Sequence, residues 1–361
     1  MKYTIFNGPR KEFDKRVPLD GVMTLTDMVR FIDPGGNDSV EPMYPDILVI
    51  HSDEYSGVAD FFIEGFLFYS SSFAKRFGYG EVLLHNPPLK IKQQLQNSHA
   101  DYIEVEEENH QYTNLNLEHL KAIKNNFEKT IHGQKEVKNQ ILTSLYSLTN
   151  SGKHKPTVVM LYGPTSVGKT ETAKLVNIII NPEYKLFRKQ LSMFHNESFM
   201  NYIFGDKSTS FAKDLLDRET NIILLDEFDK AHSMFYSAFY QLFDEGVYVD
   251  KFYEVNLENT IIFCTSNYQS KQEIEKNLGA PIFSRFDHFI EFEKLDNEAK
   301  MNIIEEVYNE EILKFSQIDQ QEIQNQNVKE RLKSKVSSLK HAREIRKLTI
   351  QLMARLLINK I

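Results

Sequence analysis

The chain has 361 residues, of which 26% are charged and 41% hydrophobic, and a formal net charge of −8 at pH 7. This length and composition indicate a globular protein with two or three domains. A single cysteine, Cys264, excludes an internal disulfide framework, and no apolar run approaches the roughly 18 residues of a membrane span. The start of the chain lacks the apolar core of a secretory signal, so we expect a cytoplasmic protein with no membrane partner.

The charge is distributed unevenly along the chain. Residues 1–114 carry 10 Lys and Arg against 18 Asp and Glu, whereas residues 115–361 carry 33 of each. This asymmetry predicts a domain boundary near residue 110. The acidic N-terminal part also argues against nucleic acid as its partner, because phosphate binding requires a basic surface.

Residues 1–110 are predicted to form a small α/β or α+β domain that serves as an adaptor or partner-recognition module. Apolar runs at Ile47–Ile50 and 82–84 are typical of strands, and the Phe-rich stretch 60–77 fits a helix or a pair of strands. We expect its aromatic side chains to form a packed core, with a partner-binding groove as the alternative. The acidic cluster 104–108 is interpreted as a solvated linker. Turn-forming clusters separate these runs at 33–36, 42–45 and 86–88.

Residues 117–123 and 136–148 have apolar side chains at helical spacing. Between these predicted helices, Ile131, His132 and Gly133 form a break that could hold an adenine ring against the backbone.

The stretch 158–170, VVMLYGPTSVGKT, carries the pattern G-x-x-x-x-G-K-[ST] after a short β-branched apolar run. In such a loop the backbone N–H groups surround phosphate oxygens, and the glycines let the backbone approach the anion. We expect Lys169 to reach the β- and γ-phosphates and the Thr170 hydroxyl to bind Mg²⁺. The preceding strand and the helix-compatible residues that follow distinguish this loop from a chance match. The residues expected to bind the nucleotide are Gly163, Pro164, Thr165, Ser166, Val167, Gly168, Lys169, Thr170 and Glu171.

A second apolar strand, 222–225, ends at Asp226 and Glu227. Ligands bind at the carboxyl ends of parallel strands, and adjacent carboxylates at such a place are costly unless a cation accompanies them. Mg²⁺ with its triphosphate supplies that cation. We expect Asp226 to hold the metal through water, and Glu227 to orient and activate the attacking water.

Two polar residues beyond this strand are further candidates. Asn267 follows a third apolar strand, 261–265, and its amide could bind the attacking water or the γ-phosphate; the alternative is a cap for the next helix. Arg285, in the segment 280–287, could reach the γ-phosphate of a neighbouring subunit, and the alternative is an intramolecular salt bridge.

Residues 296–361 are predicted to be all-helical, with the stretch 316–328 as a solvated helix end or loop. Arg343 begins a helix from which a lid could contact phosphate. Residues 329–360 contain 10 Lys and Arg against two Glu, which could indicate nucleic acid. A helical-domain surface with one arginine over the nucleotide is the simpler explanation.

In their order along the chain, these motifs resemble an AAA+ module of the Clp/Hsp100 clade, specifically the second ATPase module of ClpB-type disaggregases. The resemblance covers about residues 115–361 and rests on GPTSVGKT, IILLDEFDKAH, QLFDEGVYVDKFYEVNLENTIIFCTSN, and FSRFD followed by IEFEKLD. It implies ATP and Mg²⁺ as cofactors. It also implies an αβα P-loop core at 115–295 and a C-terminal helical lid at 296–361, assembled as a homo-oligomeric ring or spiral, usually of six.

The same resemblance implies roles for individual residues. Walker A falls at 163–170 and Walker B at Asp226 and Glu227. Sensor 1 falls at Asn267, and sensor 2 at Arg343. An arginine finger that acts in trans falls at Arg285, and Ile131, His132 and Gly133 would lie at the adenine pocket.

One segment departs from the family pattern. Unfoldases of this clade carry a glycine-flanked aromatic pore loop between the Walker strands, and here the corresponding segment, NYIFGDKSTSFAKDLL, is shorter and lacks that element. Phe204 or Phe211 could take its place, but neither is flanked as the family pattern requires. A second pore segment near 248–253 keeps its aromatic residues.

Three functions follow from the sequence. The first is an ATPase that couples Mg-ATP hydrolysis to remodelling of a protein partner, as chaperones and unfoldases do. The second is a nucleotide-dependent oligomeric switch that controls a separate effector without threading a polypeptide, which the shortened pore segment favours. The third is a DNA-acting loader, which the basic C-terminal helices favour and the acidic N-terminal part opposes.

Overall fold

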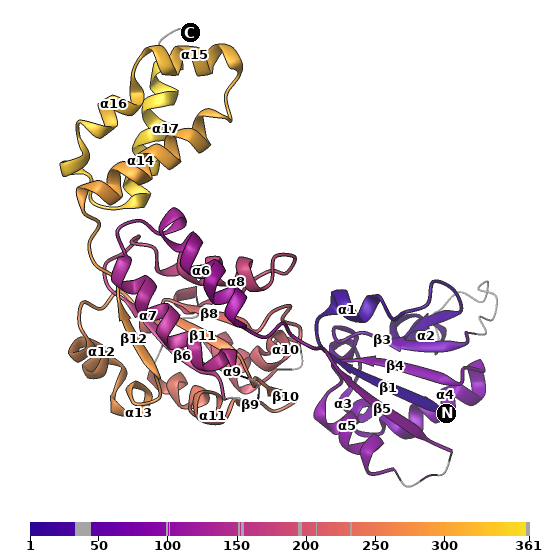
Figure 1. Ribbon diagram of the computed structural model, residues 1–361. Coiled ribbons are helices and arrows are strands. Elements are labelled where there is room, and N and C mark those ends of the chain that lie inside the picture. Colours follow the sequence, from indigo (N-terminus) through magenta and orange to yellow (C-terminus); the bar gives the residue numbers. More distant parts are fainter. Residues whose placement is uncertain are drawn as a thin grey trace. The chain divides into compact units, whose positions relative to one another are not determined.

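The computed structural model describes residues 1–32, 45–98, 100, 102–150, 152, 155–193, 197–206, 208–231 and 233–358 (Figure 1). The predicted turn cluster at 33–36 and most of the one at 42–45 lie outside these residues, as do Lys207 and His232 of the quoted motifs. Within the described part of the chain, no helix has the length and apolar character needed to cross a membrane.

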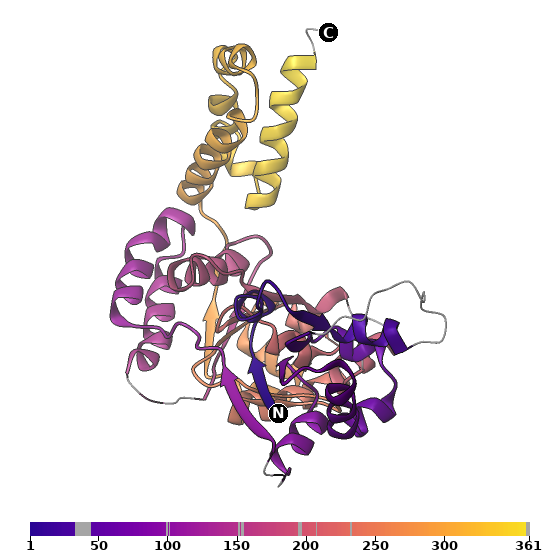
Figure 2. The same ribbon diagram turned by 90° about the vertical axis from the view of Figure 1, so that its right-hand side faces the viewer.

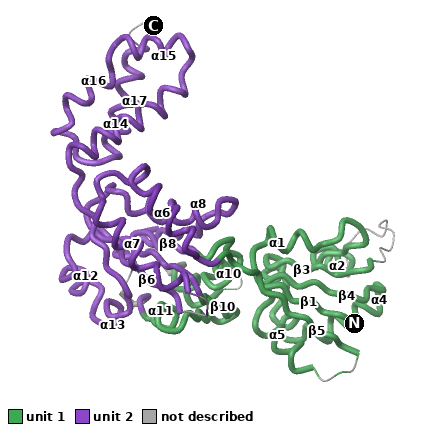
Figure 3. The backbone as a smooth tube through the Cα atoms, in the orientation of Figure 1, with its two compact units in different colours: residues 1–113, 194–221, 237–258 green, residues 114–193, 222–236, 259–361 purple. Residues whose placement is uncertain are grey.

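The backbone forms two compact units (Figure 3). Unit 1 comprises residues 1–113, 194–221 and 237–258, and unit 2 comprises residues 114–193, 222–236 and 259–361. The division of the chain at residues 110 and 295 into three domains stays a prediction.

Unit 1 is built on a parallel five-stranded sheet with the strand order β2-β3-β4-β1-β5. Successive side chains of a strand point to opposite faces, so Ile5 and Leu84 pack on one face of this sheet and Phe6 and Leu83 on the other. The strands are β1 (Lys2–Asn7), β2 (Val22–Thr24), β3 (Ile47–Ile50), β4 (Glu81–His85) and β5 (Glu104–Asn109). The strands predicted at 47–50 and 82–84 are therefore confirmed.

The Phe-rich stretch 60–77 forms two helices rather than a strand pair. Phe62, Phe66 and Phe77 are buried in the core of unit 1, as expected, whereas Phe61 and Phe68 are exposed. The helices of this part are α1 (Arg10–Asp14), α2 (Leu25–Ile32), η1 (Glu54–Gly57), α3 (Asp60–Glu64), α4 (Phe66–Phe77) and α5 (Leu89–Gln96).

The prediction of a solvated linker at 104–108 is wrong, because these residues form the edge strand β5. It pairs in parallel with β1 over its whole length. Its acidic side chains stay at the surface, where Glu106 lies 2.9 Å from Lys2 and Glu108 lies 2.9 Å from Arg16. Charged side chains on an edge strand discourage further strands from adding to the sheet.

The later parts of unit 1 contain short elements and a two-stranded antiparallel hairpin, β9–β10. They are α9 (Glu197–Phe204), α10 (Phe211–Leu216), η5 (Ser233–Phe239, which begins in unit 2), α11 (Tyr240–Glu245), β9 (Val247–Val249) and β10 (Glu254–Asn256).

Unit 2 contains a second parallel five-stranded sheet, with the order β12-β6-β11-β8-β7. Its three central strands, β6, β11 and β8, are buried along their whole length, which fits the uninterrupted apolar runs in the sequence. Cys264 lies buried within β11, as predicted. The strands are β6 (Thr157–Tyr162), β7 (Phe187–Gln190), β8 (Ile222–Asp226), β11 (Ile261–Thr265) and β12 (His288–Glu291).

Because all these strands are parallel, their carboxyl ends lie at one edge of the sheet. The loop after β6, the carboxylates at the end of β8 and the polar residues after β11 therefore come together. The helical elements of this αβα part are α6 (Leu117–Thr130), α7 (Lys135–Tyr146), η2 (Ser147–Thr149), α8 (Lys169–Ile180), η3 (Leu191–Met193), η4 (Phe228–Lys230), α12 (Lys271–Leu278) and α13 (Ala280–Phe283).

The C-terminal part of unit 2 is helical, as predicted, and Figures 1 and 2 show its helices, coloured orange to yellow, packed against one another. The expectation of a solvated end or loop at 316–328 is wrong for most of that stretch, because α15 occupies it and buries Ile323. The elements are α14 (Asn297–Ile312), α15 (Gln317–Asn325), α16 (Val328–Lys333), η6 (Val336–Ser338) and α17 (Ala342–Ile358).

Candidate nucleotide-binding site

The glycine-rich loop joins β6 to α8 and has a backbone that only glycine tolerates at two positions. Gly163 and Gly168 have φ values of +124° and +114°. A Cβ atom at Gly163 would lie 2.2 Å from the carbonyl oxygen of Phe292, and one at Gly168 would lie 3.0 Å from the Ile131 side chain. The loop therefore packs tightly against the rest of unit 2, with its remaining surface facing a cavity.

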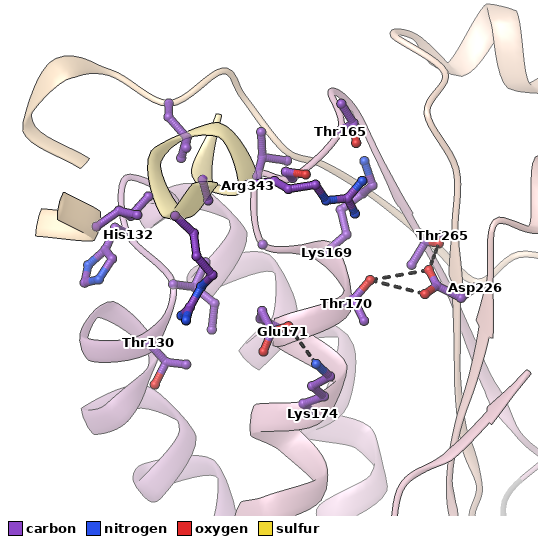
Figure 4. Close-up of a pocket in the computed structure, with 18 of the residues that line it drawn as sticks. Thr130, His132, Thr165, Lys169, Thr170, Glu171, Lys174, Asp226, Thr265 and Arg343 are labelled. Carbon is purple, nitrogen blue, oxygen red and sulfur yellow. Dashed lines mark hydrogen bonds and ion pairs between the residues drawn. The ribbon is translucent and has the colours of Figure 1, made fainter. Parts of the chain in front are cut away.

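That cavity has a volume of about 660 Å³, which is in the range typical of small-molecule sites. Figure 4 shows Thr130 and His132 at one end and Asp226 with Thr265 at the other, with Lys169 and Thr170 between them. The predicted site residues that line it are Ile131, His132, Thr165, Ser166, Val167, Gly168, Lys169, Thr170, Glu171, Asp226, Glu227, Asn267 and Arg343.

Four predicted residues are not part of this lining. Gly163 and Pro164 belong to the loop and contact Lys169 through their carbonyl oxygens. Gly133 packs against the lid instead, where a Cβ atom would lie 2.6 Å from that of Ala299. Arg285 lies after α13, outside the lining residues of the cavity.

Lys169 is a buried ammonium group, only 8% exposed. Its Nζ donates to the carbonyl oxygens of Gly163 and Pro164, each at 2.6 Å, and to Oδ1 of Asn267 at 3.2 Å. Burial lowers the pKa of Lys169 to about 8, although Asp229 and Asp226 act in the opposite direction. Since its three acceptors are neutral oxygens, a bound anion would supply the missing counter-charge.

Asn267 is not a helix cap. The helix that follows, α12, is capped by Ser270, whose side chain accepts from the backbone N–H of Glu273. The amide of Asn267 is instead directed to Lys169, at the carboxyl end of β11.

Asp226 is 5% exposed, and both of its carboxylate oxygens are engaged. The Thr265 hydroxyl donates to Oδ1 at 2.5 Å, and Arg188 donates to Oδ2 from Nη2 at 2.5 Å and from Nε at 3.1 Å. The Thr170 hydroxyl lies 3.4 Å from both oxygens. This hydroxyl and carboxylate are the hard oxygen groups that Mg²⁺ uses together with phosphate oxygens and water, so the residues present fit that ion.

Glu227 directly follows β8 and has a left-handed backbone, with a φ of 55°. Its N–H donates to the Thr265 hydroxyl at 2.9 Å, and its Oε2 accepts from Gln190 Nε2 at 3.0 Å. Thr265 therefore contacts both carboxylate residues at once, through the side chain of Asp226 and the backbone of Glu227.

The opposite end of the cavity is lined by the lid and by the break between α6 and α7. Ile131 lies there with Leu295, Ile303 and Val307, which suits a flat heterocyclic base. His132 Nε2 lies 2.9 Å from Glu306 Oε2 on α14 and connects the break between α6 and α7 to the lid.

Two arginines of α17 face the cavity. Arg346 is paired with Glu310 and Glu311, each at 2.6 Å. Arg343, in the first turn of α17, is exposed, and its side chain makes no hydrogen bond or ion pair with any residue that the structure describes. It is therefore available to an anion bound at the loop.

The roles of Arg188, Gln190 and Thr265 in this network could not be predicted from the sequence. The first two lie on β7, whose sequence FRKQ has neither an apolar run nor an alternating pattern. Their place becomes evident only from the pairing of β7 with β8, which puts Gln190 opposite Asp226. Thr265 was recognised as the end of a strand, but the sequence does not reveal its contacts.

A glycine-rich phosphate loop, an apolar strand that ends in two carboxylates and a polar residue on the neighbouring strand together define a P-loop nucleotide site. A model of the AAA domain (Cdc48 subfamily) matches residues 154–338, just over half of the chain. The chain therefore belongs to the AAA family, and it is an AAA+ ATPase of the Clp/Hsp100 clade.

Two relatives illustrate the similarity. The chain is 26% identical over 212 residues to the chaperone protein ClpB of Malacoplasma penetrans (strain HF-2). It is also 26% identical over 213 residues to the ATP-dependent Clp protease ATP-binding subunit ClpL of Staphylococcus aureus (strain USA300). In both cases the match covers 52% of this chain and only 30% of the relative.

Proposed function

We propose that this protein couples hydrolysis of Mg-ATP to conformational work on a protein partner, with residues 1–110 as the module that recognises the partner. One observation carries the proposal. A single cavity is lined by a buried cation, Lys169, by the carboxylates of Asp226 and Glu227 at the end of β8, and by the amide of Asn267. The cation suits a triphosphate, the two carboxylates suit a divalent cation, and the amide can form a hydrogen bond with an attacking water.

In the proposed reaction, Lys169 contacts the β- and γ-phosphates, and Arg343 approaches the same oxygens from the lid. Glu227 accepts a proton from the water that attacks the γ-phosphorus in line, while Asn267 orients that water. Thr170 and Asp226 would hold Mg²⁺, which when bound neutralises charge on the phosphate oxygens. Ile131, His132 and the apolar lid residues would enclose the base.

We propose that the protein works in the cytoplasm as a homo-oligomer, with Arg285 completing the site of a neighbouring subunit. The position of Arg285 outside the lining of its own cavity supports this arrangement. Rings or spirals of six are the form that the family resemblance suggests.

A second candidate is a nucleotide-dependent switch that controls its partner without threading it. The observation that favours it is the burial of most aromatic residues available to grip a polypeptide. Phe211, Tyr248 and Tyr253 are at most 2% exposed, and the Tyr248 hydroxyl donates to the Ile203 carbonyl. Phe204 is 45% exposed, and Phe252 is partly exposed.

The internal contacts of unit 1 also suit a switch. The Arg10 N–H donates to Asp217 Oδ1 at 2.6 Å, the Leu89 N–H donates to the Phe252 carbonyl at 2.8 Å, and Arg218 lies over the Tyr112 ring. The N-terminal sheet is thereby bound to segments 194–221 and 237–258. These segments precede and follow β8 in the chain, so a change at Asp226 and Glu227 has a direct covalent route to unit 1.

The test of hydrolysis compares wild type with Glu227→Gln. We expect the variant to bind ATP with wild-type affinity in calorimetry but to release no phosphate, because it lacks the base while keeping the shape of the side chain. Phosphate release at the wild-type rate would contradict the assigned role of Glu227.

The same variant, held in ATP, should trap the partner for identification. ATP-driven unfolding of a tagged model substrate would favour the remodelling function, whereas trapping of a folded partner without unfolding would favour the switch. Salt-dependent binding to DNA would instead support a DNA-acting protein.

A further inference from the structure

The carboxylate proposed to hold the metal is already occupied by a cation of the protein itself. Arg188 contacts Oδ2 of Asp226 through two nitrogens, while Thr265 occupies Oδ1. The Asp226 side chain is 8% exposed, whereas that of Arg188 is 42% exposed. Of the two partners, Arg188 therefore has the freedom to move, and Asp226 is fixed by the packing around it.

Arg188 donates two hydrogen bonds to Oδ2 and so uses both lone pairs of that oxygen, which puts it in competition with a hydrated divalent cation. Both need the lone pairs of the same oxygen, and two positive centres a few ångströms apart repel strongly where water is largely excluded. Competition for Oδ2 would therefore favour release of Arg188 from Asp226 when the cation binds. Arg188 then leaves into the cavity that it lines together with Lys169 and Thr170, where the terminal phosphate of a bound triphosphate would lie.

We propose that Arg188 is a metal-dependent positioning residue. Without a divalent cation it neutralises Asp226, and with the cation and a triphosphate present it transfers to the terminal phosphate. The inference rests on the proposed function, and it goes further by naming a residue that links metal occupancy to recognition of the γ-phosphate. A long planar guanidinium suits both positions, because carboxylate and phosphate oxygens present similar geometry.

The proposal predicts two separate changes in Arg188→Gln. Without a divalent cation, the variant leaves the negative charge of Asp226 uncompensated, and this charge repels ADP. The ratio of the Kd for ADP in EDTA to the Kd for ADP in Mg²⁺ should therefore rise roughly tenfold. With Mg²⁺ present, the variant lacks the contact to the terminal phosphate. The preference for the non-hydrolysable analogue β,γ-imido-ATP over ADP should therefore fall, again by roughly tenfold.

Calorimetric titrations of the full-length protein with ADP and β,γ-imido-ATP, each in Mg²⁺ and in EDTA, measure both ratios. Lys189→Gln is the matched control, because it removes the same charge from the next position of β7, whose side chain points to the other face of the strand. We expect wild-type ratios for this control. Arg188→Lys keeps the charge without the planar fork, so we expect it to restore most of the metal-free ADP affinity but not the preference for the triphosphate.

An unchanged metal ratio with ADP in Arg188→Gln would show that Arg188 does not compete with the cation. An unchanged triphosphate preference would show that it does not move to the phosphate, and equal weakening under all four conditions would reduce Arg188 to a structural role. Each of these results overturns the proposal. If Arg188→Gln does not fold, the Arg188→Lys titrations decide through the triphosphate preference alone, and an unchanged preference in that variant overturns the proposal. A wild-type protein that binds neither nucleotide under any condition would overturn the proposed function itself, and this inference with it.

Discussion

Thr265 offers the sharpest test of how the carboxylates of Asp226 and Glu227 are held. Its hydroxyl donates to Asp226 Oδ1 at 2.5 Å and accepts from the Glu227 N–H at 2.9 Å. Thr265→Val keeps the shape of the side chain and removes both bonds. The lost bond to a buried carboxylate and the orphaned N–H together should lower the free energy of unfolding by about 2 to 4 kcal/mol.

The effect on turnover should be larger than the effect on binding. Glu227 has a left-handed backbone, which is costly for a residue with a side chain and persists when its surroundings hold it in place. Without Thr265 the Glu227 carboxylate can shift relative to the attacking water, and a displacement of about 1 Å can cost on the order of 100-fold in rate. The nucleotide itself should still bind, because Lys169 and the loop are untouched.

Steady-state ATPase assays would give kcat and KM, calorimetry the Kd for ADP, and thermal unfolding the stability. Thr265→Ser retains the hydroxyl, so it is the control and should keep kcat within a few-fold of wild type. A Thr265→Val protein that is folded, binds ADP and hydrolyses ATP at the wild-type rate would refute the reasoning.

Three further predictions follow from the same geometry. Lys169→Ala should abolish ADP binding, and in wild type the ADP affinity should fall by up to tenfold per pH unit above 8, because Lys169 must be protonated to bind the anion. Conversely, since its pKa is lowered on folding, the lysine makes the nucleotide-free protein more stable as pH rises from 8 towards 10.5, which thermal unfolding would detect. Arg285→Ala should lose ATPase activity and regain it when mixed with Lys169→Ala subunits; the trans role fails if the mixture stays inactive. Gly163→Ala should weaken nucleotide binding by more than tenfold in calorimetry, because its Cβ would collide with the Phe292 carbonyl 2.2 Å away, and wild-type affinity would contradict the need for this close approach.

Several features of the site could be predicted from the sequence because the signals are local. The phosphate loop is a contiguous motif, and the strands β6, β8 and β11 are uninterrupted apolar runs. Since these strands are parallel, the polar residues that follow them had to meet at one edge of the sheet. The same logic predicted Asn267 at this edge, and in the structure its amide oxygen accepts a hydrogen bond from Lys169.

Other features carried no local signal and misled the prediction. The acidic stretch 104–108 has the composition of a solvated linker, yet it forms β5 because β1 offers it a parallel hydrogen-bonding partner. The residues near 248–253 have the aromatic side chains of a gripping segment, but Tyr248 and Tyr253 are used for packing inside unit 1. Sequence shows that an aromatic residue is present, and only the fold shows whether its surface is available.

The sequence by itself determined that this protein has a P-loop ATPase core with two carboxylates at the end of its second apolar strand, β8. Phosphate binding depends on a short run of backbone, which a contiguous motif reveals. The tertiary structure decided what holds those carboxylates. Arg188 and Gln190 come from β7, and Thr265 from β11, so they reach Asp226 and Glu227 only through strand pairing. Contacts of this kind depend on the register of the sheet and the burial of each side chain, and these are properties of the folded chain as a whole.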